Sequence, residues 1–222
     1  MKKLPLSGAE TIFSVYPWSK NVNADNCYDY AIGDFEKYRN VKSTPGNRAR
    51  ISSNGMNFTT CRGIRKRILS DNPGTVYRCS NPNKVCRMGF YKIMNFVSPQ
   101  GDFHFYKQVK GIKYRVKKGD TKQKLEKFFK TKIGKLAAAG KYMTIHVNAW
   151  AHKQGWGAPP LYTDAKGKLI IDPRRASRNY PGLNYTTFCS AYCVKRNKAG
   201  SGANSKPGIK SKRNSKVRQN FI

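Results

Sequence analysis

Acidic residues are scarce in this sequence. The 222 residues include 11 Asp and Glu against 44 Lys and Arg, which gives a formal net charge of +33. A small domain stays in solution with a net charge of about 2 to 8, so solubility alone does not account for the excess. Because charges of one sign repel one another within a chain, we expect a partner that supplies negative charge. We favour acidic protein neighbours, with nucleic acid and an anionic surface as alternatives.

Long apolar runs are also missing. A membrane-spanning helix needs about 18 or more consecutive apolar residues, and no such stretch occurs, so no transmembrane segment is expected. Lys2 and Lys3 resemble the start of a signal peptide, but Ser7, Gly8 and Glu10 interrupt the apolar segment that should follow. We therefore expect no cleaved signal peptide.

Histidine is rare, whereas cysteine is not. The three histidines are His104, His146 and His152, and the six cysteines are Cys27, Cys61, Cys79, Cys86, Cys189 and Cys193. The chain is not a short secreted domain, so two disulfides with free thiols and a fully reduced set are both open. Only Cys189 and Cys193 have the close spacing of a zinc site. We expect no metal and no cofactor, and buried thiols or a local disulfide instead.

Periodicity and turn residues predict an α+β domain. An extended segment, residues 1–25, precedes a helix that begins near Asn26 and runs to residue 36, with Asp25 or Asn26 as its cap. Gly101 and Gly111 are expected in turns between strands. The other expected elements are helices over 61–69 and 121–139 and strands over 74–79, 84–97, 102–109, 112–117 and 142–152.

Two later segments carry the clearest patterns. In 121–139 an apolar stripe is surrounded by lysines, which is typical of an amphipathic helix; the stripe is Leu125, Phe128, Phe129, Ile133 and Leu136. In 142–152 apolar and polar residues alternate, as in a strand with one buried face. Residues 195–222 contain nine Lys and Arg and no acid, a composition that should be disordered alone.

A Cys–His pair is the candidate for catalysis. Cys27 lies at the expected start of a helix, where the helix dipole and backbone amides favour the nucleophilic thiolate. His104 lies on a later strand as a candidate base, and His152 lies on the next one as an orienting group. The alternative is that Cys27 is a small apolar residue of a helix and that His104 is a core residue.

Five motifs together resemble a papain-like cysteine amidase/peptidase-related family, distantly akin to the CHAP-type and NlpC-type cell-wall enzymes. They are NCYDYA (26–31), GDFHFYKQ (101–108), WAHKQGWGAPP (150–160), DAKGKLIIDPR (164–174) and FCSAYCV (188–194). The resemblance implies a papain-like fold in which the Cys27 helix packs on an antiparallel sheet. It implies Cys27 as nucleophile, His104 as base and His152 as orienting group, with Asn148 or His146 as substitutes for His152.

The resemblance and the patterns divide the chain into three parts. Residues 26–194 are expected to form the papain-like core, with the strands that carry His104 and His152 as neighbours. Within it, residues 114–149 are a basic helical insertion that the family lacks. Residues 1–25 form the N-terminal extended segment and residues 195–222 the basic extended tail.

Three functions follow as hypotheses. We favour a basic structural or cementing component of a large assembly, a virion minor capsid protein, that uses the papain-like domain as scaffold and the basic helix and tail as adhesive. Its location would be the virion, with the cytoplasm as the alternative. The second hypothesis is an active cysteine amidase or peptidase that cleaves cell-wall peptide or isopeptide bonds. The third is a nucleic-acid-binding packaging protein.

Overall fold

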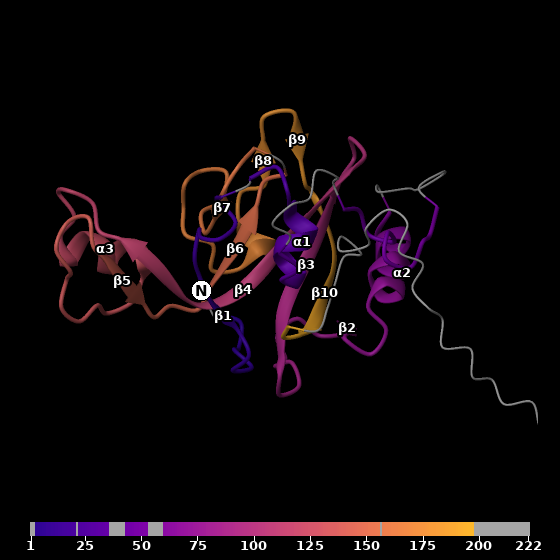
Figure 1. The fold of residues 1–222 in the computed structure, drawn as a ribbon, viewed down its shortest axis with the longest axis horizontal. Coiled ribbons are helices and arrows are strands. Elements are labelled where there is room, and N and C mark those ends of the chain that lie inside the picture. The colour runs from indigo at the N-terminus through magenta and orange to yellow at the C-terminus, as the bar shows by residue number, and fades with distance from the viewer. Residues whose placement is uncertain (1–2, 21, 36–42, 53–59, 156, 198–222) are drawn as a thin grey trace, which may run out of the picture.

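The protein has a mixed α+β architecture in which two helices lie on one face of an eight-stranded sheet (Figure 1). The computed structural model describes residues 3–20, 22–35, 43–52, 60–155 and 157–197. The main strand order is β2 (Val76–Cys79), β10 (Thr187–Lys195), β3 (Phe90–Ser98), β4 (Asp102–Arg115), β6 (Ala149–Lys153) and β7 (Pro160–Leu161), and adjacent strands in this order are antiparallel.

Strand β4 also pairs with two strands outside that order. β1 (Thr11–Phe13) runs parallel to it, and β5 (Tyr142–Ile145) runs antiparallel to its C-terminal end. A separate hairpin consists of β8 (Asn179–Tyr180) and β9 (Leu183–Asn184). The helices are α1 (Cys27–Ile32), α2 (Cys61–Asp71), α3 (Lys122–Phe129) and the 3-10 helix η1 (Pro173–Arg175).

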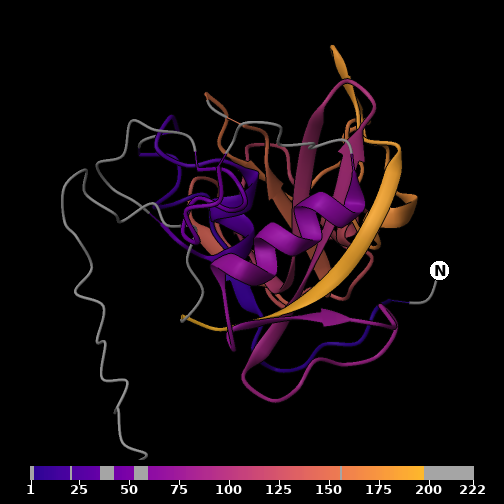
Figure 2. The same cartoon turned by 90° about the vertical axis from the view of Figure 1, so that its right-hand side faces the viewer.

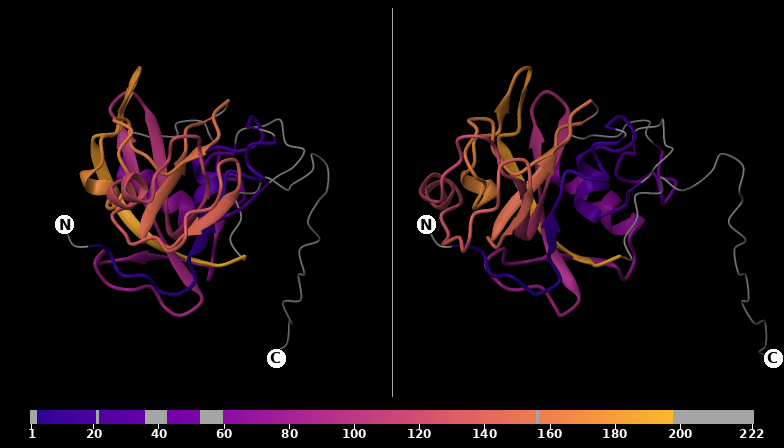
Figure 3. Two further views of the ribbon diagram at one scale, coloured as in Figure 1. Left: turned by 90° about the vertical axis from the view of Figure 1, so that its left-hand side faces the viewer. Right: turned by 60° about the vertical axis from the view of Figure 1, so that its left-hand side comes forward.

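Both faces of the central sheet are buried. Successive residues of a strand point to opposite sides of the sheet, so neighbouring residues of one strand belong to different cores. Ile93 of β3 packs with α1 and α2 on one face, and the next residue, Met94, packs with Trp150 on the other. Figure 3 shows α1 and α2 together on one side of the sheet, and Figure 2 shows α2 lying across it beside β10. Residues Tyr91 to Ser98 of β3 are therefore all buried, the polar Lys92 and Asn95 among them.

Most expected elements form, but several boundaries were wrong. The helix expected over 26–36 ends at Ile32, because Gly33 adopts a left-handed conformation with φ 78° and donates to Asp29 O and Tyr30 O. The helix expected over 121–139 ends at Phe129, because Lys130 is left-handed with φ 52°. Ile133 is still buried in the core beneath this segment, although it lies outside a helix.

The strand predictions need two corrections. Gly111 is not in a turn: β4 passes straight through it, and a Cβ there would lie 3.1 Å from the Ile145 carbonyl oxygen of β5. Close approach of two strands therefore explains the glycine. The strand expected over 84–97 begins only at Phe90, after turns, and the strand expected over 142–152 is divided into β5 and β6.

The described residues cover most of the three predicted parts of the chain, but little of the tail. Phe13 of the N-terminal segment is buried, and β1 belongs to the sheet. The region 114–149 contains α3 and β5, which fold back on the end of β4. Of the predicted tail 195–222, residues 198–222 lie outside the described residues. No helix of the described residues has the length and apolar character that crossing a membrane requires.

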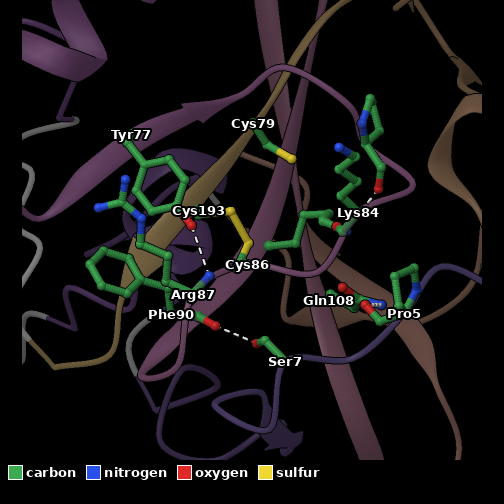
Figure 4. Close-up of a disulfide and its surroundings, with 12 residues drawn as sticks. Pro5, Ser7, Tyr77, Cys79, Lys84, Cys86, Arg87, Phe90, Gln108 and Cys193 are labelled. Carbon is green, nitrogen blue, oxygen red and sulfur yellow. Dashed lines mark hydrogen bonds between the residues drawn. A yellow bond between two sulfur atoms is a disulfide. The ribbon is translucent and has the colours of Figure 1, made fainter.

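Two disulfides hold β10 to distant parts of the chain. Cys61 of α2 bonds to Cys189, and Cys86 bonds to Cys193 (Figure 4). The expected local disulfide was wrong for a geometric reason. The register of β10 shifts between Phe188 and Ser190, so Cys189 packs toward the helices and Cys193 toward the opposite face. Residues four apart on a strand are also about 13 Å apart, which is beyond disulfide reach.

Removing one disulfide should cost much of the stability. The Cys61–Cys189 bond spans 128 residues, and the loop-closure model assigns about 4 to 5 kcal/mol to a loop of this length. We expect the double variant Cys61→Ser/Cys189→Ser to lose that free energy of unfolding in urea, whereas Cys79→Ser, at a buried cysteine outside the disulfides, should lose much less. Equal losses in the two variants would show that these bonds do not constrain the fold.

Candidate active site

Cys27 is the first residue of α1, placed there by a well-formed cap. The side chain of Asn26 accepts hydrogen bonds from Tyr28 N and Asp29 N, and Asp29 Oδ2 accepts from Asn26 N at 2.9 Å. This reciprocal arrangement is a capping box. Two first-turn amides are thus already satisfied by Asn26, and the helix has only six residues. Helix-end stabilisation of a Cys27 thiolate is therefore weaker than the sequence suggested.

The Cys27 thiol lies beside the strand that carries His104. Its Sγ donates to the carbonyl oxygen of Phe103, the residue before His104, at 3.7 Å. The side chain is buried, with 4% exposure. Cys27 and His104 nevertheless line one pocket of about 350 Å³. The structure therefore brings these two predicted site residues to the same cavity.

Pairing of β4 with β6 places the two predicted histidines side by side, which confirms the prediction that their strands are neighbours. Lys107 is opposite Ala151, so His104 and His152 lie diagonally on the same face of the two strands. His104 Nε2 is 2.8 Å from His152 Nδ1, and His152 Nε2 is 2.9 Å from the Thr163 carbonyl oxygen. Both rings are buried, at 2% and 0% exposure.

The Thr163 carbonyl determines where the protons of both rings lie. A carbonyl oxygen only accepts, so His152 must carry a proton on Nε2. Neutral His152 then has its lone pair on Nδ1 and accepts the Nε2 proton of His104. Neutral His104 is left with its own lone pair on Nδ1. This chain of hydrogen bonds therefore selects the tautomer in which His104 has one nitrogen able to act as a base.

Burial keeps both imidazoles neutral. Removal from water lowers the pKa of His104 well below its ordinary value of 6.5, and the nearby His152 lowers it further. Burial also lowers the pKa of His152 to about 4, against the opposing effects of the hydrogen bond to Thr163 and the charge of Asp164. At neutral pH both imidazoles are thus uncharged. Cys27 is likewise neutral in this arrangement, because its thiol donates a hydrogen bond to the Phe103 carbonyl.

Aromatic residues of the β8–β9 region close the pocket over His104. The Tyr185 ring stacks on the His104 ring, with centroids 4.9 Å apart and planes at 29°. Its hydroxyl donates to Asp102 Oδ2 at 2.8 Å. Tyr180 and Leu183 line the same pocket. The sequence analysis missed Tyr185, because only folding brings the hairpin back over β4. It also missed Asp102, although this residue is the first of the DFHFY motif that contains His104.

A buried lysine beneath the site was also missed. Lys153 is fully buried, and its Nζ donates to Val22 O and Gly155 O at 2.7 and 2.5 Å. Burial lowers its pKa, whereas the carboxylates of Asp25 and Asp29, and Cys27 when it is ionised, oppose that shift. Lys153 therefore places a positive charge in the neighbourhood of the thiol. Its position directly after His152 in the WAHK motif was the signal for it.

The substitutes considered for His152 lie elsewhere. His146 is exposed. The Asn148 side chain accepts from Gln108 Nε2 at 3.0 Å and donates to Leu4 O. Only His152 is seen to bond His104 among the described residues. In that same part of the chain no group of three or more His, Cys, Asp or Glu side chains is placed to hold a metal ion.

Comparison with known proteins finds no relative of this chain. No protein-family model matches the chain, and no curated protein or solved structure is similar enough to it to count as a match. The functional argument therefore rests on the pocket and its residues.

Reactivity of the two thiols outside the disulfides tests the site. Cys79 is buried with 9% exposure and donates to Asn81 O, so exposure alone would make it at least as reactive as Cys27. We expect iodoacetamide to label Cys27 faster, because His104 can accept its proton. Labelling followed by peptide mass spectrometry measures both rates in one sample. His104→Ala should slow labelling of Cys27 but not of Cys79; equal rates at both thiols would contradict an activated Cys27.

Stability should fall in acid because of the histidine pair. Unfolded histidine binds protons near pH 6.5, whereas folded His152 does so only near pH 4. The stabilisation is therefore present above pH 6.5 and is lost as the pH falls toward 4. Between pH 7.5 and 4.5 we expect His152 to account for a loss of about 2.5 kcal/mol. Urea unfolding of the wild type and His152→Gln at both pH values measures it; identical pH dependence would contradict the assignment.

Proposed function

We propose that the protein is a cysteine amidase or peptidase with a papain-like arrangement of its site. One observation carries the proposal: Cys27 and His104 line one pocket, and His104 is held through His152 by the Thr163 carbonyl. A nucleophile, a base and a group that orients the base are the parts that acyl transfer requires.

The reaction follows from the protonation states. His104 Nδ1 takes the Cys27 proton as Sγ attacks the carbonyl carbon of an amide. The His104 imidazolium keeps donating through Nε2 to neutral His152, whose own Nε2–H stays on that ring and donates to the Thr163 carbonyl oxygen. His104 then gives its proton to the leaving amine, and a thioester remains on Cys27. Water hydrolyses the thioester, with His104 taking one proton of the water, and the free thiol is restored.

The substrate class is an amide within a peptide, including isopeptide bonds of cell-wall peptides. The pocket is lined mainly by apolar and aromatic side chains, with Asp102 as its carboxylate. Such a pocket suits an extended peptide segment better than a highly charged polymer. The large positive charge would then hold the enzyme on an anionic surface that carries the substrate.

A structural role is the second candidate, and a separate observation favours it. Cys27 and His104 are 4% and 2% exposed, so the site is nearly closed. Together with two disulfides, which are typical of proteins outside reducing compartments, this supports a minor capsid protein of a virion that uses the domain as scaffold. Its basic surfaces would bind acidic neighbours in the assembly.

Hydrolysis assays separate the two candidates. We expect the wild type to hydrolyse a cell-wall peptide library. We also expect Cys27 to form a covalent adduct, either a thioester with the substrate or an irreversible adduct with iodoacetamide. Cys27→Ala should abolish both, and His104→Ala should lower the rate by about 10² to 10⁴. His152→Ala should lower it less, and His146→Ala, at an exposed position, should leave it unchanged.

The pH profile adds a second criterion. Because His104 must be neutral to accept the proton, its lowered pKa should place the acid limb of the activity below pH 6.5. The enzyme proposal would be overturned if the wild type formed no adduct and hydrolysed none of the peptides. If the Cys27→Ala variant then folded and assembled normally, the structural proposal would replace it.

A further inference from the structure

The C-terminal part of β4, α3 and β5 form a distinct basic lobe, defined here as residues 113–145. β5 folds back on β4 in antiparallel register from Ile112–Ile145 to Arg115–Tyr142. Figure 1 shows α3 and β5 at one end of the molecule, away from α1 and the β8–β9 hairpin. The basic lobe is therefore separate from the pocket that Cys27 lines.

Every basic residue of the lobe is exposed. There are eleven, against two acids: Lys113, Arg115, Lys117, Lys118, Lys122, Lys124, Lys127, Lys130, Lys132, Lys135 and Lys141. Both acids already serve the fold: Asp120 accepts from Tyr114 and Lys117 N, and Glu126 accepts from Ile133 N. Within the described residues, the one ion pair of the lobe joins Lys132 to Glu126 at 3.9 Å. The positive charge of the lobe is thus largely unbalanced.

Packing explains why the charge is all on the outside. Leu125 and Phe129 of α3 are buried together with Ile133 against the β4–β5 ribbon. This apolar stripe uses the only buried face of the helix, so the lysines between its members must point to solvent. The fold therefore places the lysines of α3 on the solvent-facing side of the helix.

Exposed aromatic rings lie among these lysines. Tyr142 is 61% exposed and Phe128 is 37% exposed. Lys113 Nζ lies 5.2 Å from the centroid of the Tyr142 ring. Flat rings beside cations are the combination that binds single-stranded nucleic acid, in which phosphates pair with the cations and bases stack on the rings.

We propose that the basic lobe binds single-stranded nucleic acid. The choice over an acidic protein rests on residue type: lysine is depleted in the cores of protein–protein interfaces, whereas phosphate contacts are made by lysine and arginine without apolar burial. The Lys-rich surface offers point charges with few fixed hydrogen-bond directions, so binding should show little sequence preference. This inference is independent of the proposed hydrolase activity.

Two charge-matched variants of the full chain test the proposal. The lobe variant is Lys118→Gln/Lys122→Gln/Lys127→Gln/Lys135→Gln. The control variant, with the same net charge, changes four exposed lysines elsewhere: Lys66→Gln/Lys84→Gln/Lys166→Gln/Lys168→Gln. Fluorescence anisotropy with a labelled oligothymidine measures affinity across a salt series, and a thiol-labelling assay confirms that Cys27 is unaffected in both.

We expect the lobe variant to bind oligothymidine at least about tenfold more weakly, with the slope of log affinity against log salt reduced by about 2 to 3, since each single-strand phosphate contact contributes about 0.7. The control variant should retain its affinity within about twofold. Tyr142→Ala should weaken single-strand binding about fivefold or more while leaving duplex binding unchanged.

Three outcomes would overturn the proposal. Equal losses in the two charge-matched variants would mean that total charge, not the lobe, governs binding. Tighter binding of polyglutamate than of oligothymidine, lost in the lobe variant, would assign the lobe to an acidic protein. Tighter binding to phosphatidylserine vesicles, again lost only in the lobe variant, would assign it to a membrane surface.

Discussion

Hydrogen bonding along β4 is the interaction on which the rest of the structure depends. This 14-residue strand pairs with β3, β6, β1 and β5. Its first half holds His104 next to His152 of β6, and its last residues hold the ribbon that supports α3. A strand of this length extends on the order of 40 Å. One element thus supports the candidate active site at one end and the basic lobe at the other.

The candidate site depends on how buried polar groups are satisfied. His104 and His152 are removed from water but joined to each other and to a carbonyl, and buried Lys153 donates to two more carbonyls. An unpaired polar group in such a position would cost about 1 to 3 kcal/mol or more. Because backbone carbonyls supply the partners, the protonation states follow from the fold itself. The same burial that keeps the imidazoles neutral also restricts access to Cys27.

The two candidate activities use different parts of the surface. The pocket is lined by Cys27, aromatic rings and Asp102, whereas the lobe presents lysines around Tyr142 and Phe128. Such a separation lets a polyanion hold the protein in place without blocking the pocket. It also means that each function can be removed by substitution without damage to the other.

By itself, the sequence determined the local chemistry: a capped helix start beside Cys27, the apolar positions Leu125, Phe129 and Ile133, a strand at His152 and the excess of positive charge. These depend on neighbours within a turn or a strand. Only the tertiary structure decided that α3 ends at Phe129, that β4 continues through Gly111, and that Cys61 and Cys86 bond to opposite faces of β10. It also placed Tyr185, Thr163 and Lys153 at the site. Those outcomes depend on contacts between residues distant in the chain, which periodicity and spacing do not encode.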